Sequence, residues 1–129
     1  RFLVGMQPKA IVIACGTVSS VAPDACREIF SGTMLGVIEP ACRAALCGGA
    51  KRIGVLATQA TVNSGAFMRT LLNLDSTAQV LQIACPLFVP LVENGVFDAD
   101  DPVPQLVAER YLRPMEAWGR RRPSESWSW

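Results

Sequence analysis

The sequence predicts an α/β protein with a mostly parallel sheet and flanking helices. Several short apolar runs lack polar alternation, which is typical of strands buried on both faces. These runs alternate with segments whose apolar residues recur at helical spacing. The chain has 129 residues, half of them hydrophobic, so it can form the core of one domain or of part of a larger protein.

The predicted elements follow one another at the spacing of βαβ units. Strands end at glycine, threonine or Cys-Pro, and Pro40 suits the first position of a helix that stops at Gly48-Gly49. Asp101 caps the last helix, with Pro102 in its first turn. In chain order, we expect a strand at 10–15, a helix at 18–30, a strand at 35–38, a helix from 40, a strand at 52–57, a helix at 62–74, a strand at 79–84, a short apolar segment at 87–92 and a helix from 102.

Charge and residue usage exclude several classes of function. Twelve basic and eleven acidic residues give a net charge of +1, too little for a nucleic-acid or membrane-surface partner. Histidine is absent, which excludes a Ser-His-Asp triad, a Cys-His dyad or a histidine-containing metal site within these residues. We therefore expect no metal site. Five cysteines without a CxxC pair indicate reduced thiols and a cytoplasmic protein.

Small polar residues follow three of the predicted strands. They are Cys15-Gly16-Thr17, the pair Thr58 and Thr61, and Cys85. Ligands of parallel α/β sheets bind at the carboxyl ends of the strands, so these residues are candidates for a binding site. The alternative is that they are turn and packing residues. Packing is also the interpretation for the cysteines within predicted helices, which are Cys26, Cys42 and Cys47.

Four blocks in order resemble the glutamate racemase family of the aspartate/glutamate racemase superfamily. They are Ile11-Val12-Ile13-Ala14-Cys15-Gly16-Thr17, Gly36-Val37-Ile38-Glu39-Pro40, the segment from Ile53 to Gly65 with Thr58-Gln59-Ala60-Thr61-Val62-Asn63-Ser64, and Ala84-Cys85-Pro86-Leu87-Phe88-Val89-Pro90-Leu91-Val92-Glu93. The resemblance covers residues 10–118. It implies two α/β domains, of which residues 1–33 are a remnant of the first and residues 34–118 most of the second. We expect residues 119–129 to form a divergent, disordered tail.

The resemblance implies interconversion of L- and D-glutamate without a cofactor, in support of peptidoglycan synthesis. Two cysteines flank the α-carbon in this family, and Cys15 corresponds to the first of them. Gly16, Thr17, Thr58 and Thr61 are then expected to contact the substrate. A cysteine at a helix N-terminus suits the role of base, because oriented backbone N–H groups stabilise its thiolate.

Three departures from the family pattern predict an incomplete fragment. The N-terminal Asp-Ser-Gly block is missing, Gly16 stands where the family has asparagine, and no Cys-Thr-His block supplies the second cysteine. We therefore expect a truncated or out-of-frame product that is inactive alone. The exposed apolar edge at residues 11–13 predicts homo-oligomers. The alternatives are a relative of aspartate or hydantoin racemases and a non-catalytic module that binds a small acid.

Overall fold

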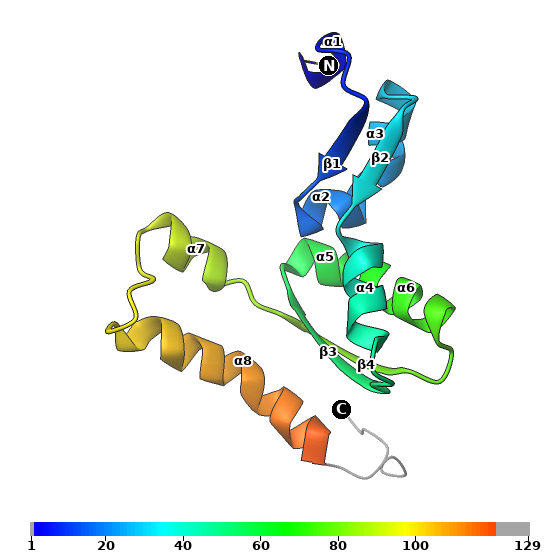
Figure 1. Cartoon of the computed structure of the whole chain (residues 1–129). Helices are drawn as coiled ribbons and strands as arrows, with labels where there is room; N and C mark the ends of the chain where they lie inside the picture. Colours follow the sequence, from blue (N-terminus) through cyan, green and yellow to red (C-terminus); the bar gives the residue numbers. More distant parts are fainter. Residues whose placement is uncertain (1, 121–129) are drawn as a thin grey trace. The chain divides into compact units, whose positions relative to one another are not determined.

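The computed structural model describes residues 2–120, and Figure 1 shows the course of the chain. Two compact units are present, of which the first ends at Ala84 and the second begins at Cys85. The first unit contains α1 (Phe2–Gly5), β1 (Ala10–Ile13), α2 (Gly16–Val21), α3 (Pro23–Ile29), β2 (Thr33–Gly36), α4 (Ile38–Leu46), β3 (Arg52–Ala57), α5 (Gln59–Ser64), α6 (Ala66–Leu74) and β4 (Gln79–Ala84). The second contains α7 (Phe88–Glu93) and α8 (Pro102–Arg120).

All strand pairing in the described residues is parallel, which confirms the predicted fold class. The strands form two separate sheets of two strands each. β1 pairs with β2 from Ala10↔Thr33 to Ile13↔Gly36. β3 pairs with β4 from Arg52↔Gln79 to Ala57↔Ala84. In each sheet two helices connect the strands, so the carboxyl ends of both strands lie at the same edge.

Two helices predicted as continuous are each broken into two. Residues 18–30 form α2 and α3, because Ala22 leaves the helical region at φ −129° immediately before Pro23. A proline disfavours helical geometry in the residue that precedes it, so the break falls at Ala22. The helix predicted at 62–74 begins earlier, at Gln59, and breaks at Gly65, whose φ of 65° is left-handed. Glycine adopts this conformation without the usual cost of a side chain.

Further boundaries differ from the sequence prediction. β1 ends at Ile13 rather than at residue 15, and β2 begins at Thr33 rather than at residue 35. β2 ends at Gly36 and α4 begins at Ile38, two residues before Pro40. Proline is tolerated there because the first N–H groups of a helix have no partner within it. The apolar segment at 87–92 forms the helix α7, and Gly119 and Arg120 continue α8. The remainder of the predicted tail lies outside the described residues.

The hydrophobic core belongs to the second sheet. Ile53 and Val55 of β3 pack with Ile38 and Cys42 of α4 and with Leu71 of α6. The first sheet is less covered, since Val12 of β1 is 63% exposed and its partner Leu35 of β2 is 54% exposed. Ile11 and Ile13 are partly buried. One of the predicted exposed apolar positions is therefore open to solvent.

The units found in the structure do not correspond to the domains inferred from the family. The structure divides after Ala84, whereas the predicted boundary follows residue 33 and refers to the family fold. That assignment stays a prediction. Among residues 2–120, no helix is long and apolar enough to cross a bilayer.

A polar cluster joins the start of β3 to the end of α6. Lys51 donates to the Asp75 carboxylate at 2.6 Å and to the Thr77 hydroxyl at 3.0 Å. The Thr77 hydroxyl and backbone N–H both donate to the other oxygen of Asp75. These hydrogen bonds, chiefly that of Lys51, lower the pKa of Asp75 from 3.8 to about 2.

Replacing Leu71 with alanine should lower the free energy of unfolding by about 3 kcal/mol, because its side chain is 1% exposed and a cavity would remain. The matched control is the adjacent Leu72, which is 38% exposed. Its replacement with alanine should cost less than about 1 kcal/mol. Urea denaturation of both variants measures the difference, and equal losses would contradict the assigned core.

Stability should fall as the pH drops from about 4 to about 2. The pKa of Asp75 is lowered in the folded chain, so its contribution is present above its ordinary pKa of 3.8 and is lost as the carboxylate protonates near pH 2. Asp75→Asn and Lys51→Met should both reduce this part of the acid dependence. Thermal unfolding between pH 2 and pH 6 measures it, and an unchanged profile in both variants would contradict the role of the cluster.

Candidate functional site

Three of the predicted site residues meet in one cluster of hydroxyl groups. The hydroxyl oxygens of Thr17 and Thr58 are 2.9 Å apart, and those of Thr58 and Thr61 are 3.0 Å apart. The third side of the triangle, from Thr61 to Thr17, is 3.4 Å. Thr17 follows β1, whereas Thr58 and Thr61 follow β3, so the cluster joins the carboxyl ends of two different sheets. Figure 1 shows the corresponding helices, α2 and α5, next to each other.

Local structure accounts for the positions of Thr58 and Thr61. Thr58 is the N-cap of α5, and its hydroxyl oxygen accepts from the backbone N–H of Thr61 at 3.3 Å. Threonine is among the residues preferred at this position, so the cap fixes both side chains. Thr61 is 2% exposed, whereas Thr17 and Thr58 are partly exposed. A ligand that reaches the cluster therefore meets Thr17 or Thr58 first.

Cys15 and Gly16 lie at the start of α2, directly before Thr17. Cys15 is exposed, and its carbonyl oxygen accepts from the backbone N–H of Ser19 in the first turn. Gly16 begins the helix, and a Cβ atom built there would meet no atom within 4 Å. This position is therefore open enough for a side chain. The thiol of Cys15 is accessible to a reactant from solvent.

Sequence reasoning missed Ser20, the fourth hydroxyl of this cluster. Ser20 is 8% exposed, and its hydroxyl donates to the Thr17 carbonyl at 2.8 Å and lies 3.4 Å from the Thr61 hydroxyl. The available signal was its position three residues after Thr17, which places both residues on one face of a helix. We refer to Thr17, Ser20, Thr58 and Thr61 as the hydroxyl cluster.

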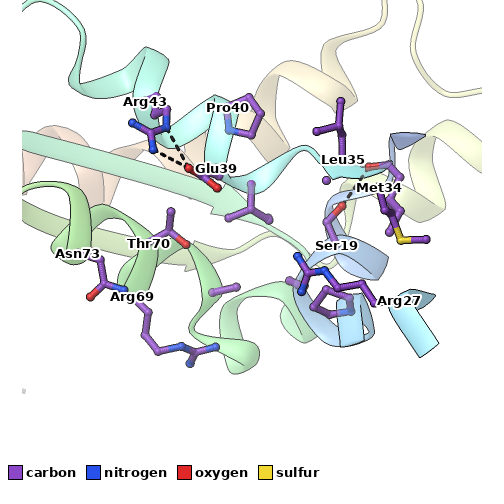
Figure 2. Close-up of a pocket in the computed structure, with 16 residues that line it drawn as sticks. Ser19, Arg27, Met34, Leu35, Glu39, Pro40, Arg43, Arg69, Thr70 and Asn73 are labelled. Carbon is purple, nitrogen blue, oxygen red and sulfur yellow. Dashed lines mark hydrogen bonds and ion pairs between the residues drawn. The ribbon is translucent and has the colours of Figure 1, made fainter. Parts of the chain in front are cut away.

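A cavity of about 630 Å³ lies beside the hydroxyl cluster in the first unit. Figure 2 shows its lining, in which Glu39 and Arg43 form an ion pair. Ser20 belongs to the lining, but Cys15, Gly16, Thr17, Thr58 and Thr61 do not. The other two arginines of the lining bind groups outside it: Arg27 pairs with Asp24, and Arg69 donates to the Ser64 carbonyl. The predicted site residues thus lie outside this cavity.

The cysteines assigned to packing differ in exposure. Cys42 is 1% exposed in the core, and burial, with a smaller effect of Glu39, raises the pKa of its thiol. Packing is confirmed for Cys42, while Cys26 is half-buried. The prediction is wrong for Cys47, which is exposed because it lies at the C-cap of α4, beyond the packed turns. Within residues 2–120, no group of three or more His, Cys, Asp or Glu side chains could hold a metal ion.

The chain matches a known family over most of its length. The model of the Asp/Glu/Hydantoin racemase family matches residues 4–114. The chain belongs to this family. The matched residues, 4–114, include every predicted site residue. The resemblance inferred from four short blocks is therefore confirmed.

Glutamate racemases are among the curated relatives. The enzyme of Thermus thermophilus is 49% identical over 111 residues, which are 86% of this chain and 39% of the relative. That of Gloeothece citriformis is 44% identical over 115 residues, which are 88% of this chain and 40% of the relative. The chain thus spans about 40% of the length of these relatives.

Solved glutamate racemases have the same fold over the shared part. The Thermus thermophilus enzyme in complex with β-chloro-D-alanine has a TM-score of 0.70 at 48% identity, covering 87% of this chain and 40% of that one. The Francisella tularensis enzyme in complex with D-glutamate has a TM-score of 0.80 at 32% identity, covering 88% and 42%. The parallel strands and flanking helices are therefore those of glutamate racemases.

Iodoacetamide should modify Cys15 and Cys47 in the folded chain but leave Cys42 unmodified. Cys15 and Cys47 are exposed, whereas Cys42 is buried and its thiol has a raised pKa. Mass spectrometry of peptides from native and urea-unfolded samples measures the modification. Alkylation of Cys42 at the rate of Cys47 under native conditions would contradict the assigned core.

Proposed function

We propose that this chain carries one of the two proton-transfer groups of a glutamate racemase, Cys15, next to hydroxyl groups that hold the substrate. The supporting observation is the hydroxyl cluster, in which Thr17 lies two residues after an exposed cysteine and meets Thr58 and Thr61. The relatives named glutamate racemase and the Francisella tularensis complex with D-glutamate support glutamate as the substrate.

The proposed chemistry starts with a thiolate at Cys15. Its sulfur takes the α-proton of glutamate, so an S–H bond forms while the C–H bond breaks. The electron pair of that bond is delocalised into the α-carboxylate. A thiol on the opposite face then donates a proton to the α-carbon, which inverts its configuration. The two proton transfers need no oxidant and no cofactor. Each requires a proton-transfer group within hydrogen-bond distance of the reacting position.

The hydroxyl cluster supplies a way to hold the substrate. Thr17 and Thr58 are partly exposed, and hydroxyl groups can donate hydrogen bonds to a carboxylate. Gly16 contributes the backbone beside them. Thr61 is buried, and its hydroxyl contacts those of Thr17 and Thr58. We therefore include Thr61 in the proposed substrate site. The carboxylate would then lie beside Thr17, next to the backbone that carries Cys15.

The second proton-transfer group is not supplied by these residues. None of the other cysteines is followed by threonine and histidine, since the sequence contains no histidine. We propose that residues 1–33 derive from the first family domain and residues 34–118 from the second, and that the chain as given does not racemise glutamate. We further propose that it acts in the cytoplasm, in the production of D-glutamate for peptidoglycan.

A second candidate function is a module that binds a small acid without catalysis. It is favoured by Gly16, which leaves open the space where the family has a side chain, and by the single matched cysteine. Aspartate and hydantoins remain alternative ligands, because the matched family is named for all three compounds. Calorimetric titration with D- and L-glutamate, aspartate and hydantoin separates these ligands.

The two functions are distinguished by comparing the chain alone with a graft, in which residues of this chain replace the matching residues of a relative. Chiral chromatography should detect no racemisation of glutamate by the 129-residue chain. Residues 4–114 grafted in place of the matching segment of the Thermus thermophilus enzyme should support racemisation. In the graft, Cys15→Ala should reduce the rate at least about 100-fold, because one of the two proton transfers is lost.

The matched control in the graft is Cys47→Ala, which also removes an exposed thiol. Its rate should stay within about twofold of the unmodified graft, as expected for a surface substitution. A graft that folds and binds glutamate but does not racemise it would favour the binding module. Turnover by the chain alone that persists in Cys15→Ala would contradict the proposed mechanism.

A further inference from the structure

Ser19 binds the backbone on both sides of Ala14, where β1 leads into α2. Its hydroxyl donates to the Ile13 carbonyl at 3.0 Å (Figure 2), and its backbone N–H donates to the Cys15 carbonyl at 2.9 Å. One residue therefore holds the peptide group that enters this segment and the peptide group that leaves it. Ser19 is 8% exposed, so water does not easily replace it as a partner of these carbonyls.

The same hydroxyl connects the ends of the two strands of the first sheet. Backbone pairing between β1 and β2 stops at Ile13↔Gly36. Directly beyond this pair, the Ser19 hydroxyl accepts from the Val37 backbone N–H at 3.4 Å while it donates to Ile13. A Cβ atom built at Gly36 would lie 3.2 Å from the Ser19 Oγ, so glycine lets α2 approach this closely. The segment that leads to Cys15 is thus attached to both strands through one side chain.

The thiol of Cys15 depends on this backbone for its position. Cys15 is exposed, and within the described residues its side chain makes no capping hydrogen bond at the start of α2. No such bond restrains the sulfur, so its position follows that of the backbone of residues 13–16. A base must lie within hydrogen-bond distance of the proton that it takes, and a displacement of about 1 Å can slow a reaction about 100-fold.

We propose that Ser19 is a positioning residue for Cys15, which holds the backbone between Ile13 and Cys15 so that the thiol meets the α-carbon of the substrate. This inference rests on the proposed function, because it takes Cys15 to be a proton-transfer group of glutamate racemisation. The Ser19 side chain bonds to Ile13 and Val37 and not to the hydroxyl cluster. Its loss should therefore slow proton transfer far more than it weakens the binding of glutamate.

Ser64, the last residue of α5, provides a matched control. Its hydroxyl makes the same two kinds of hydrogen bond, since it donates to the Thr61 carbonyl at 2.7 Å and accepts from the Ala66 backbone N–H at 3.2 Å. Ser64 is half-buried. Its bonds stay within α5 and the start of α6. Ser64→Ala therefore removes a hydroxyl of the same kind and leaves the segment that carries Cys15 in place.

The first test measures backbone order in the full chain without a ligand. NMR relaxation of the amides of residues 14–16 should give order parameters near about 0.85 in the unmodified chain and in Ser64→Ala, and below about 0.6 in Ser19→Ala. Both substitutions should lower the melting temperature, because each removes hydrogen bonds. A folded Ser19→Ala chain in which these three amides stay ordered would overturn the proposal.

The second test uses the graft of residues 4–114 in the Thermus thermophilus enzyme, with glutamate that carries deuterium at the α-carbon. Ser19→Ala should lower kcat between about 10-fold and about 100-fold and leave KM within about twofold. The isotope effect on kcat should increase for the enantiomer from which Cys15 takes the proton. It should decrease for the other enantiomer, because the later proton donation by Cys15 then becomes rate-limiting.

This pattern distinguishes positioning from a loss of folded enzyme. A smaller folded fraction lowers kcat and leaves both isotope effects unchanged. Ser64→Ala should keep kcat within about twofold and both isotope effects at their original values. If Cys15→Ala slows the graft but Ser19→Ala changes neither isotope effect, the positioning role is wrong.

Failure of the proposed function gives a different result. If Cys15→Ala leaves the rate of the graft unchanged, Cys15 is not a proton-transfer group. The proposed function and this inference then both fail, whereas the order parameters still show whether Ser19 fixes the backbone of residues 14–16.

A Ser19→Cys variant covers the case in which Ser19→Ala does not fold. The thiol fills the position of the hydroxyl but is a weak donor. It should lower the order parameters and change the two isotope effects in the same directions as Ser19→Ala. A folded Ser19→Cys variant with unchanged order parameters and unchanged isotope effects would also contradict the proposal.

Discussion

The hydrogen bond between Thr17 and Thr58 is the contact on which the candidate site depends. It joins two hydroxyl groups that are 41 residues apart in the sequence and 2.9 Å apart in the structure. In the part of the chain that the structure describes, each sheet has two strands and leads into its own strand–helix junction. Cys15 is located at one junction and Thr58 with Thr61 at the other. Neither junction alone contains both the exposed thiol of Cys15 and the three threonine hydroxyls, so the proposed site requires that α2 and α5 stay together.

The two halves of the site differ in how well they are supported. The junction after β3 rests on the main core, where α4 and α6 cover the sheet. The junction after β1 belongs to a sheet with exposed apolar residues such as Val12, and segments with few buried contacts open more easily than the core. α2 is therefore held largely by polar contacts, those of Ser19 to the first sheet and those of Thr17 and Ser20 to α5. The position of Cys15 depends on these bonds.

The sequence contained enough information for the existence of all four strands, for the exact ends of two of them and for the threonines of the cluster. β3 and β4 were predicted with their observed ends because both are mostly apolar runs that stop at a polar turn or at Cys85-Pro86, and parallel pairing brings their carboxyl ends to one edge. The helix breaks at Ala22 and Gly65 were missed because apolar periodicity continues across them, while the break depends on local backbone geometry. Ser20 was missed because serine in a helix is ordinary. Only its contact with Thr61, which is 41 residues away, gives it significance.

Because α2 has only six residues, the groups that it carries are closely coupled. Cys15 precedes its first residue, Thr17 is its second, and Ser19 and Ser20 fix it from its buried side. A carboxylate bound by Thr17 would also restrain the backbone of Cys15, two residues earlier. In the proposed function, substrate binding and the placement of Cys15 are then one event rather than two. The helix that carries Cys15 is held by the same short stretch, because Ser19 bonds to the end of the first sheet and Ser20 bonds to Thr61 of α5.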